Sequence, residues 1–378
     1  MKDYFNLSSP TRFLFPIDGD FINERDGRGV DGEIEFEASV FAAAGSQIAV
    51  NGAGATEEDG KFSAMLRIKK GENRLVATNC TDGTSDEISV FYLPGSVGKY
   101  RISSDDNILF LADITENADR YESIFENPYL AVYKKAHDLY GAKVHLNLFY
   151  AFDRTAAALF SDERPDFDLS MMTDKFKAEW EENSDWLKLS FHSRTEFPDA
   201  PYRHARPETV VADYLDVRRE VLRFAGEKSF SEAVTTVHFG AANREGVSAL
   251  RDLGHKALTG YFEVAESGRP LVAYYADVPL ALHVGERDFW RDTEMGMTFG
   301  RIDRVTNIGT LSEVMADMEK IINHPTRGGF VSIMIHEQYF HADYENYLPD
   351  FEERVLGPSR MLWERGYTGS LLSELLCE

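Results

Sequence analysis

The sequence predicts a multidomain protein of class β plus α/β, with a β-sandwich over residues 1–96 followed by a distorted (β/α) barrel over residues 97–378. The chain has 378 residues, which corresponds to two or three domains at roughly 150 residues per domain. Residues 12–94 show two-residue apolar alternation between turn signals, which is typical of antiparallel sheets. After Gly95, apolar strand-like runs alternate with helical patterns, which indicates parallel βαβ units.

The first domain consists of short alternating runs separated by turns. The run over 33–40 alternates apolar and polar residues, and the runs over 61–68 and 88–92 repeat that pattern. Asp-Gly and Gly-Glu-Asn turns separate these runs. The stretch DGKFSAMLRIKKGENRLVATN, residues 59–79, resembles bacterial immunoglobulin-like modules, in which a strand, a Gly-Glu-Asn turn and a second strand recur. This resemblance implies an immunoglobulin-like (Ig-like) sandwich and says nothing about activity.

One glycine pattern in the first domain could be mistaken for a nucleotide site. Gly27, Gly29 and Gly32 fit the G-x-G-x-x-G pattern of a dinucleotide-binding turn. That motif needs a strand before it and a helix after it. Here an alternating strand follows, so we expect no nucleotide to bind.

The second domain shows nine strand-like runs and two clear helical stripes. The predicted strands are 99–104, 143–150, 186–191, 233–239, 256–262, 271–275, 280–284, 302–308 and 330–335. Apolar residues at helical spacing predict helices over 210–221 and 311–322. About 280 residues suit a complete or distorted barrel. The charged segment 153–185 is predicted to be an excursion from it, either a lid or a surface insertion.

Composition excludes several classes of protein. Forty basic and 64 acidic residues give a formal net charge of −24, which disfavours nucleic acids and anionic membranes as partners. Two distant cysteines, Cys80 and Cys377, exclude a disulfide scaffold and a cysteine-rich zinc module. The first ten residues lack an apolar h-region, and no apolar run reaches the roughly 18 residues of a membrane span. As written, the chain is expected to be soluble and cytoplasmic.

Polar reactive residues follow four of the predicted strands. In parallel α/β folds, the carboxyl ends of the strands carry the active groups. The four strand ends read Ser103-Ser104-Asp105-Asp106-Asn107, His192-Ser193-Arg194-Thr195-Glu196, Val237-His238-Phe239-Gly240 and Met334-Ile335-His336-Glu337. Each is unremarkable alone, but together they predict an active site on one rim.

These strand ends resemble the motifs of the NodB-type polysaccharide deacetylases, a family on a distorted (β/α) barrel. The Ser-Asp-Asp-Asn segment matches the first motif, which implies that Asp105 is the general base and Asp106 a metal ligand. The second motif, His-Ser/Thr-x-x-His, matches at His192 and Ser193 but has Glu196 in place of the second histidine. The resemblance therefore implies Asp106, His192 and Glu196 as ligands, with His238 as the next candidate.

The remaining motifs match less closely. The third implies that the backbone N–H of Phe239 helps to form the oxyanion hole, but its arginine is missing, and Arg244 in the next turn is the candidate substitute. The fifth motif matches at His336, which the resemblance makes the general acid. For the fourth motif, the segment beginning at Asp288 and the residue Asp303 are both candidates. The resemblance spans residues 100–340.

The predicted function is removal of an acetyl group from a carbohydrate with the help of a divalent metal. Zinc is the first expectation, with manganese, cobalt or nickel as alternatives. A second hypothesis is a glycoside hydrolase, in which Asp105, Glu196 or Glu337 would supply two carboxylates. A third is a carbohydrate-binding protein without activity. We expect no metalloprotease, because His336 and His341 are five residues apart, not four as in His-Glu-x-x-His.

Overall fold

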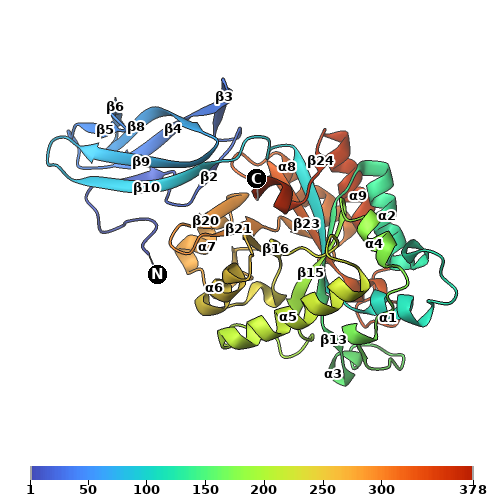
Figure 1. Cartoon of the computed structure of the whole chain (residues 1–378). Helices are drawn as coiled ribbons and strands as arrows, with labels where there is room; N and C mark the ends of the chain where they lie inside the picture. The colour runs from blue at the N-terminus through green and yellow to red at the C-terminus, as the bar shows by residue number, and fades with distance from the viewer. Residues whose placement is uncertain (1, 377–378) are drawn as a thin grey trace.

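The first ten strands form two five-stranded sheets that share one apolar core (Figure 1). The computed structural model describes residues 2–376. One sheet contains β1 (Arg12–Phe15), β3 (Gly27–Val30), β4 (Glu33–Phe41), β7 (Thr56–Glu58) and β8 (Lys61–Lys69). The other contains β2 (Phe21–Ile22), β5 (Ile48–Val50), β6 (Ala53–Gly54), β9 (Gly71–Asn79) and β10 (Ser85–Tyr92).

The alternation expected for residues 33–40 is confirmed in β4. Ile34, Phe36, Ala38 and Val40 are buried, and the antiparallel register of β4 with β8 places Ile34 opposite Ile68 in the shared core. The three glycines of the G-x-G-x-x-G pattern lie in β3 and in the turn that leads into β4, so no helix follows them. The Ig-like assignment of this part stays a prediction.

The second part contains two larger sheets. The first is parallel, with the order β15-β12-β11-β23-β22 and with β24 paired to β11. Its strands are β11 (Lys99–Asn107), β12 (Val144–Phe149), β15 (Leu187–Ser193), β22 (Arg304–Val305), β23 (Phe330–His336) and β24 (Thr368–Gly369). The second sheet is β16 (Val234–Thr235), β17 (Ala257–Gly260), β21 (Met297–Arg301) and β20 (Phe289–Asp292), in that order. Two small hairpins are β13 (Ala151–Phe152) with β14 (Phe167–Asp168) and β18 (Glu263–Val264) with β19 (Pro270–Leu271).

Helices lie around the outside of these sheets (Figure 1). They are α1 (Leu109–Glu116), α2 (Pro128–Tyr140), α3 (Arg154–Ala157), α4 (Lys177–Glu182), α5 (Pro207–Phe224), α6 (Arg244–Asp252), α7 (Val278–Val284), α8 (Leu311–Ile322), α9 (Phe351–Glu364) and α10 (Leu372–Leu376). The short 3₁₀ turns are η1 (Ile124–Glu126), η2 (Leu169–Met171), η3 (His238–Gly240) and η4 (Glu337–Phe340). Both predicted helices are confirmed, as α5 and α8.

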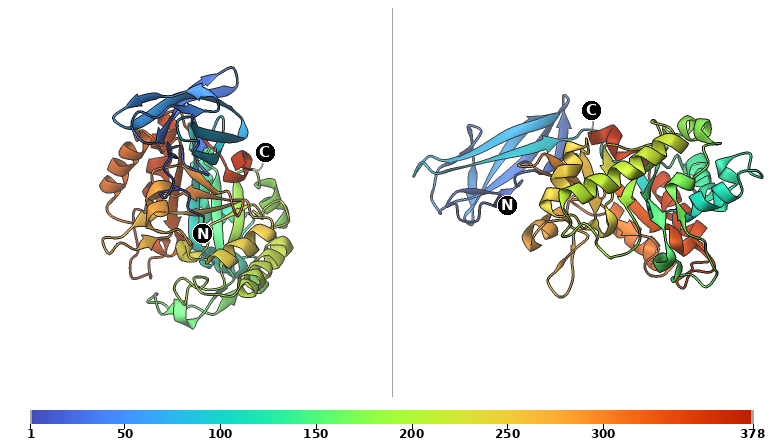
Figure 2. Two further views of the ribbon diagram at one scale, coloured as in Figure 1. Left: turned by 90° about the vertical axis from the view of Figure 1, so that its left-hand side faces the viewer. Right: turned by 60° about the horizontal axis from the view of Figure 1, so that its bottom comes forward.

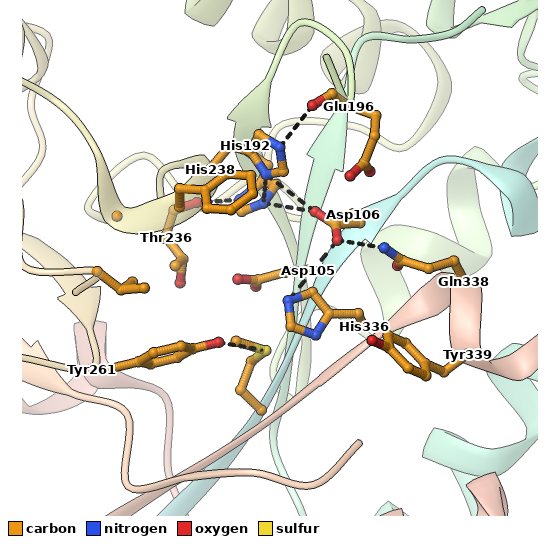
Figure 3. Close-up of a pocket in the computed structure, with 14 residues that line it drawn as sticks. Asp105, Asp106, His192, Glu196, Thr236, His238, Tyr261, His336, Gln338 and Tyr339 are labelled. Carbon is orange, nitrogen blue, oxygen red and sulfur yellow. Dashed lines mark hydrogen bonds and ion pairs between the residues drawn. The ribbon is translucent and has the colours of Figure 1, made fainter. Parts of the chain in front are cut away.

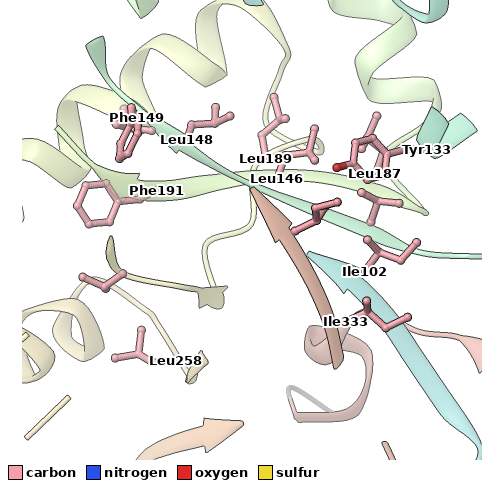
Figure 4. Close-up of a cluster of buried hydrophobic side chains, with 14 of the residues drawn as sticks. Ile102, Tyr133, Leu146, Leu148, Phe149, Leu187, Leu189, Phe191, Leu258 and Ile333 are labelled. Atoms are coloured by element: carbon pink, nitrogen blue, oxygen red, sulfur yellow. The ribbon is translucent and has the colours of Figure 1, made fainter. Parts of the chain in front are cut away.

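Apolar side chains from both sheets meet in the interior of the second part. Figure 4 shows members of this cluster, among them Leu146, Phe191, Leu258 and Ile333. Among the described residues, β15 and β16 belong to different sheets, and β15 forms only an isolated bridge, from Leu189 to Phe230, with the segment before β16. The hydrogen-bonded ladder is therefore interrupted, and a distorted barrel stays a prediction.

Several predicted strands are shorter than expected, and one is a helix. The run 280–284 lies in α7, because Asp277 caps this helix by accepting from the Leu280 N–H at 3.1 Å, with Pro279 in its first turn. A five-residue apolar run cannot distinguish strand from helix by its period. The run 233–239 forms only the two-residue β16, after which the chain turns into η3.

The segment 153–185 consists of the short elements α3, β14, η2 and α4. Trp180 is buried and packs against Phe110 and Phe224. Arg223 of α5 donates to the carbonyl oxygens of Leu169 and Met172, at 2.7 and 2.8 Å. These contacts anchor much of the segment to the rest of the second part.

The sandwich-forming part, which contains β1–β10, packs on one end of the second part, which contains the elements from β11 onward (Figure 2). Phe21 and Phe91 lie in one apolar cluster with Phe289, Phe330 and Leu372. The strands β11, β16, β17 and β23 begin at or beside this contact, so their carboxyl ends lie toward the opposite end. The division at residues 96 and 97 itself stays a prediction.

Among the described residues, no helix is both long and apolar enough to span a membrane.

Candidate active site

A cavity of about 290 Å³ lies where the carboxyl ends of β11, β15 and β23 meet η3 (Figure 3). The register of β11 with β23 sets Asp105 beside His336. All six predicted site residues line this cavity, together with His238; the predicted six are Asp105, Asp106, His192, Glu196, Phe239 and His336. The structure thus brings together the groups that the four strand ends suggested.

Backbone geometry at the end of β11 lets two consecutive carboxylates share the cavity. Successive side chains of a regular strand point to opposite faces. Asp106 has a φ of 61°, in the left-handed region, and the pairing of β11 with β12 shifts register between Ser104 and Asn107. This irregularity breaks the alternation, so Asp105 and Asp106 both line the cavity.

Asp106, His192 and His238 form the one compact group of potential metal ligands found among the described residues. Their ligand atoms all lie within 4.8 Å of one another, and all three side chains are buried. Asp106 Oδ1 lies 3.1 Å from His192 Nε2 and 3.3 Å from His238 Nδ1, and the two nitrogens are 3.1 Å apart. Tetrahedral ligands at about 2.0–2.2 Å from a metal are themselves separated by roughly 3.4 Å.

Carbonyl oxygens fix the protonation of the two histidines. His192 Nδ1 contacts the carbonyl oxygen of Thr236, and His238 Nε2 lies 2.9 Å from that of Glu196. Because a carbonyl oxygen only accepts hydrogen bonds, both nitrogens must carry hydrogen. In neutral rings, the other two nitrogens present lone pairs to each other and to Asp106. Three facing lone pairs repel one another unless a cation lies between them, so the site fits a metal ion.

The directions of the pKa shifts of Asp106 and His192 also favour a cation at this group. Burial alone would raise the pKa of Asp106, but the surrounding histidines hold it well below its usual range. Burial would lower the pKa of His192, yet the carboxylates of Asp105 and Asp106 raise it. In the absence of metal, a proton would therefore supply the positive charge that the group needs.

Asp105 lies beside this group of potential ligands and is not a member of it. Its Oδ1 accepts a hydrogen bond of 2.6 Å from Asn147 Nδ2, and the described residues donate none to Oδ2. Arg101, buried in the same strand, attracts this carboxylate, while burial lowers the pKa of the arginine to about 10. Arg244, the substitute considered from the sequence, instead pairs with acidic residues outside the cavity.

His336 lies on the other side of Asp106. Its Nδ1 is 2.9 Å from Asn307 Oδ1, which must accept, so this nitrogen carries the hydrogen. The opposite nitrogen, Nε2, lies 3.9 Å from Asp106 Oδ2. Gln338 donates to the same carboxylate oxygen at 2.8 Å.

Glu196 differs in position from the expectation. Its carboxyl group lines the cavity but is not a member of the compact ligand group, which has His238 in its place. Burial, followed by the nearby charge of Asp106, raises the pKa of Glu196 to about 8. Its contact with the ligand group is made by its backbone carbonyl, which accepts from His238.

Aromatic side chains form the walls of the cavity. Phe239 has a φ of 57°, and its side chain is 43% exposed. Tyr261 and Tyr339 line the opposite parts of the same cavity. The turn that presents Phe239 is closed by a hydrogen bond of 2.6 Å from Gly240 N to Val237 O.

Three other residues considered from the sequence lie outside this cavity. Glu337 is buried and accepts from the backbone N–H groups at the start of α1. The residues after His336 form η4, not an α-helix, so a His-Glu-x-x-His arrangement is absent from this segment. Asp288 accepts from the backbone of Gly328 and Phe330, and Asp303 lines a neighbouring cavity.

Sequence reasoning missed the two asparagines that orient the acid and base candidates. Asn147 lies inside β12, and Asn307 lies in the loop after β22. Only the pairing of β12 with β11 and of β22 with β23 brings them to the rim. An asparagine within the apolar run of β12 was the one available signal.

Comparisons with known proteins give little further information. No family model matches this chain, and no curated protein matches it significantly. One similar solved structure is a Bordetella bronchiseptica protein described as a "putative polysaccharide deacetylase involved in O-antigen biosynthesis", at 11% identity and TM-score 0.33 over 74% of this chain and 90% of that chain. Another is a "putative alpha-galactosidase/melibiase" from Bacteroides fragilis, at 11% identity and TM-score 0.19 over 66% of this chain and 56% of that chain. At these TM-scores neither likeness establishes a shared fold or function.

Proposed function

We propose that this protein is a metal-dependent hydrolase that removes an acetyl group from a carbohydrate. One observation carries the proposal. Asp106, His192 and His238 bring three potential ligand atoms within 4.8 Å of one another, and a separate carboxylate and a separate histidine line the same cavity. Three protein ligands that leave a position open, with an acid and a base beside them, are typical of catalytic metal sites.

Asp106 Oδ1, His192 Nε2 and His238 Nδ1 would hold the metal. When bound there, a divalent ion supplies Lewis-acid polarisation of the substrate carbonyl and lowers the pKa of water. Two imidazole nitrogens and one carboxylate oxygen suit zinc, and cobalt, nickel or manganese are compatible. The carbonyl oxygens of Thr236 and Glu196 keep both rings oriented for this role.

Asp105 is the proposed general base. The hydrogen bond from Asn147 holds one carboxylate oxygen, which leaves the other for a proton from the attacking water. Asn147 is itself fixed, because its Oδ1 accepts from Ser190 at 2.6 Å. The carboxylate of the proposed base is therefore oriented by a neutral donor that is itself held in place.

His336 is the proposed general acid. Because Asn307 binds its Nδ1, protonation of the ring places the new hydrogen on Nε2, which faces the ligand group. From there the proton can pass to the leaving nitrogen or oxygen of the sugar. The backbone N–H of Phe239 is the proposed donor to the oxyanion.

The aromatic walls of the cavity support a carbohydrate as substrate. The exposed ring of Phe239 and the rings of Tyr261 and Tyr339 offer apolar surfaces around the reacting position. Aromatic rings beside a few polar groups are a common way to bind and orient small ligands. Glu337 cannot serve as a glycosidase carboxylate, because three backbone N–H groups bind its carboxyl group away from the cavity.

Acetate release from a panel of N- and O-acetylated saccharides tests this proposal. We expect activity that disappears after chelation and returns when zinc, cobalt, nickel or manganese is added. Cleavage of glycosidic bonds by metal-free protein would contradict the proposal and support the glycosidase hypothesis. Saccharide binding with no acetate release from any metal-loaded sample would indicate an inactive binding protein.

A further inference from the structure

A second cavity, of about 570 Å³, adjoins the candidate active site. Phe239, Tyr261 and Val272 line both cavities, so a substrate with its acetyl group at the metal ligands could extend past these residues. Arg301 Nη1 donates to the carbonyl oxygen of Tyr261 at 3.0 Å and so connects the two cavities directly.

Basic side chains predominate in the lining of this second cavity. The basic residues are Arg269, Arg301, Arg304, Lys320 and Arg327. The acidic residues are Glu263, Asp303 and Asp317. The formal balance is 5 − 3 = +2, in a chain whose net charge is −24. A local excess of positive charge in so acidic a protein is unexpected for a solvated surface and indicates selection of an anion.

Two of these arginines have buried N–H donors without a hydrogen-bond partner among the described residues. Arg327 makes no hydrogen bond or ion pair with any described residue, and its Nε and Nη1 are buried. Arg301 is only 8% exposed, and its Nε also has no hydrogen-bond partner. The nearest carboxylate oxygen, Asp303 Oδ1, is 3.8 Å from that nitrogen, which is too far for a hydrogen bond.

The acidic residues of the lining offset these two arginines only in part. Asp303 forms a long ion pair with Arg301, at 3.8 Å, and Arg327 is left without an ion-pair partner among the described residues. Asp317 already pairs with Lys320 at 2.9 Å and with Arg304 at 3.4 Å. Glu263 is exposed, and its carboxylate lies 3.9 Å from Arg301, where solvent weakens the attraction. Arg327 therefore retains unused charge and donors at the cavity.

We propose that the second cavity binds an anionic group of the substrate, a carboxylate, phosphate or sulfate carried by the sugar or by its neighbour in a glycan. The inference rests on the function proposed above for the identity of the reacting group, and it adds the class of saccharide. Arg327 and Arg301 supply the charged donors, and Arg269 lies exposed at the rim. Guanidinium groups bind such oxygen anions with charge-assisted hydrogen bonds.

Binding of simple charged sugars tests the inference without relying on catalysis. The probes are glucuronate, glucose 6-phosphate and glucose 6-sulfate, each compared with glucose by calorimetric titration at low salt. We expect at least one charged sugar to bind about tenfold more tightly than glucose, and Arg327→Gln to remove that difference. The three probes also show which anion the cavity prefers.

A matched variant controls for the loss of one positive charge. Arg120 is exposed and lies outside both cavities, so Arg120→Gln should bind all the sugars as the unaltered protein does. If Arg327→Gln fails to fold by circular dichroism, Arg269→Gln replaces it, with an expected loss of about threefold. Equal affinity for charged and neutral sugars in the unaltered protein would overturn the inference. So would an Arg327→Gln protein, or the substitute Arg269→Gln protein, that keeps the preference.

Failure of the inference can be told apart from failure of the proposed function. Asp106→Asn should lose metal but keep the preference for charged sugars, because Asp106 is not part of the second cavity. If the protein prefers charged sugars through Arg327 but releases no acetate, the anion site is supported and the hydrolase proposal is contradicted. If it releases acetate but shows no preference for charged sugars, the hydrolase proposal is supported and the anion site is contradicted.

Discussion

Two adjacent carboxylates at the end of β11 have different surroundings, and the difference separates their proposed roles. Asp106 contacts both ligand histidines, whereas Asp105 contacts Asn147 and neither histidine by hydrogen bond. The left-handed backbone at Asp106 creates this separation within two consecutive residues. The proposed base and the proposed metal ligand can therefore be altered independently.

Replacing each carboxylate in turn tests the separation. Asp105→Asn should keep its metal, because Asp105 is outside the ligand group, but its rate of acetate release should fall by about 10²–10⁴-fold. Asp106→Asn should lose both metal and activity. Metal content by elemental analysis, measured beside acetate release, checks both variants. Equal metal loss in the two proteins would refute the assignment.

His238 and Glu196 are alternative third ligands, and the structure favours the histidine. His238→Ala should weaken metal binding by more than about 100-fold, since it removes a direct ligand. Glu196→Ala should change the affinity by less than about tenfold, because only its backbone carbonyl contacts His238. Competitive titration with a chelator measures both affinities. The reverse order of effects would restore Glu196 as the ligand that the family motif suggested.

At the scale of secondary-structure elements, Glu337 links the end of β23 to the start of α1. Its two carboxylate oxygens accept from the backbone N–H groups of Ile108, Leu109 and Phe110, at 2.6, 3.0 and 2.5 Å. A carboxylate at this position satisfies unpaired helix donors and interacts favourably with the helix dipole. Because α1 begins three residues after Asp106, the same contacts hold the backbone that carries this proposed metal ligand.

Glu337→Gln should therefore destabilise the fold and weaken metal binding together. We expect a loss of about 1–3 kcal/mol in the free energy of unfolding, since a charged acceptor for three buried donors is removed. Glu116→Gln, at the exposed far end of α1, is the control and should change neither quantity. Chemical denaturation and metal titration measure the two effects. A Glu337→Gln protein of unaltered stability would show that Glu337 does not hold this helix start.

Elements with a long, regular pattern could be predicted from the sequence, and short ones could not. The stripes in α5 and α8 span several turns, so their period is unambiguous. The run 280–284 in α7 is too short for its apolar period to distinguish a helix from a strand, and the cap at Asp277 favours the helix. For the site, the strand ends revealed Asp105, Asp106 and His192, but the choice of His238 over Glu196 as ligand depends on the path of η3.

At the scale of the whole molecule, the interface between the two parts contains buried charges as well as apolar surface. Asp26 pairs with Arg287 at 2.6 Å, and Asp20 pairs with His283 at the same distance. Trp290 donates its indole N–H to the carbonyl oxygen of Asp18 at 2.9 Å. None of the residues that line the two cavities comes from the sandwich-forming part, which packs at the opposite end.

This interface should make stability depend on pH in the acid range. Burial would raise the pKa of Asp20, but His283 and Arg287 lower it below its ordinary value of 3.8. A lowered folded-state pKa stabilises the protein fully above about pH 4, and this contribution is lost as pH falls through the folded-state pKa. Below pH 4, the free energy of unfolding should therefore fall less steeply with decreasing pH in Asp20→Asn than in the unaltered protein. The two slopes should differ by up to about 1.4 kcal/mol per pH unit.

Urea denaturation at several pH values from 5 to 2.5 measures this slope. Asp31→Asn, at an exposed turn of the sandwich-forming part, is the matched control and should keep the slope of the unaltered protein. Identical slopes for Asp20→Asn and the unaltered protein would mean that Asp20 does not contribute to the interface in the way described.

The most direct test of the central claim is a crystal structure of metal-loaded protein with anomalous scattering data at the absorption edge of the metal. We expect one strong peak in the first cavity, about 2.0–2.2 Å from Asp106 Oδ1, His192 Nε2 and His238 Nδ1, with Asp105 outside this distance. A peak ligated by Asp105, or a metal-soaked crystal with no peak at these three residues, would contradict it.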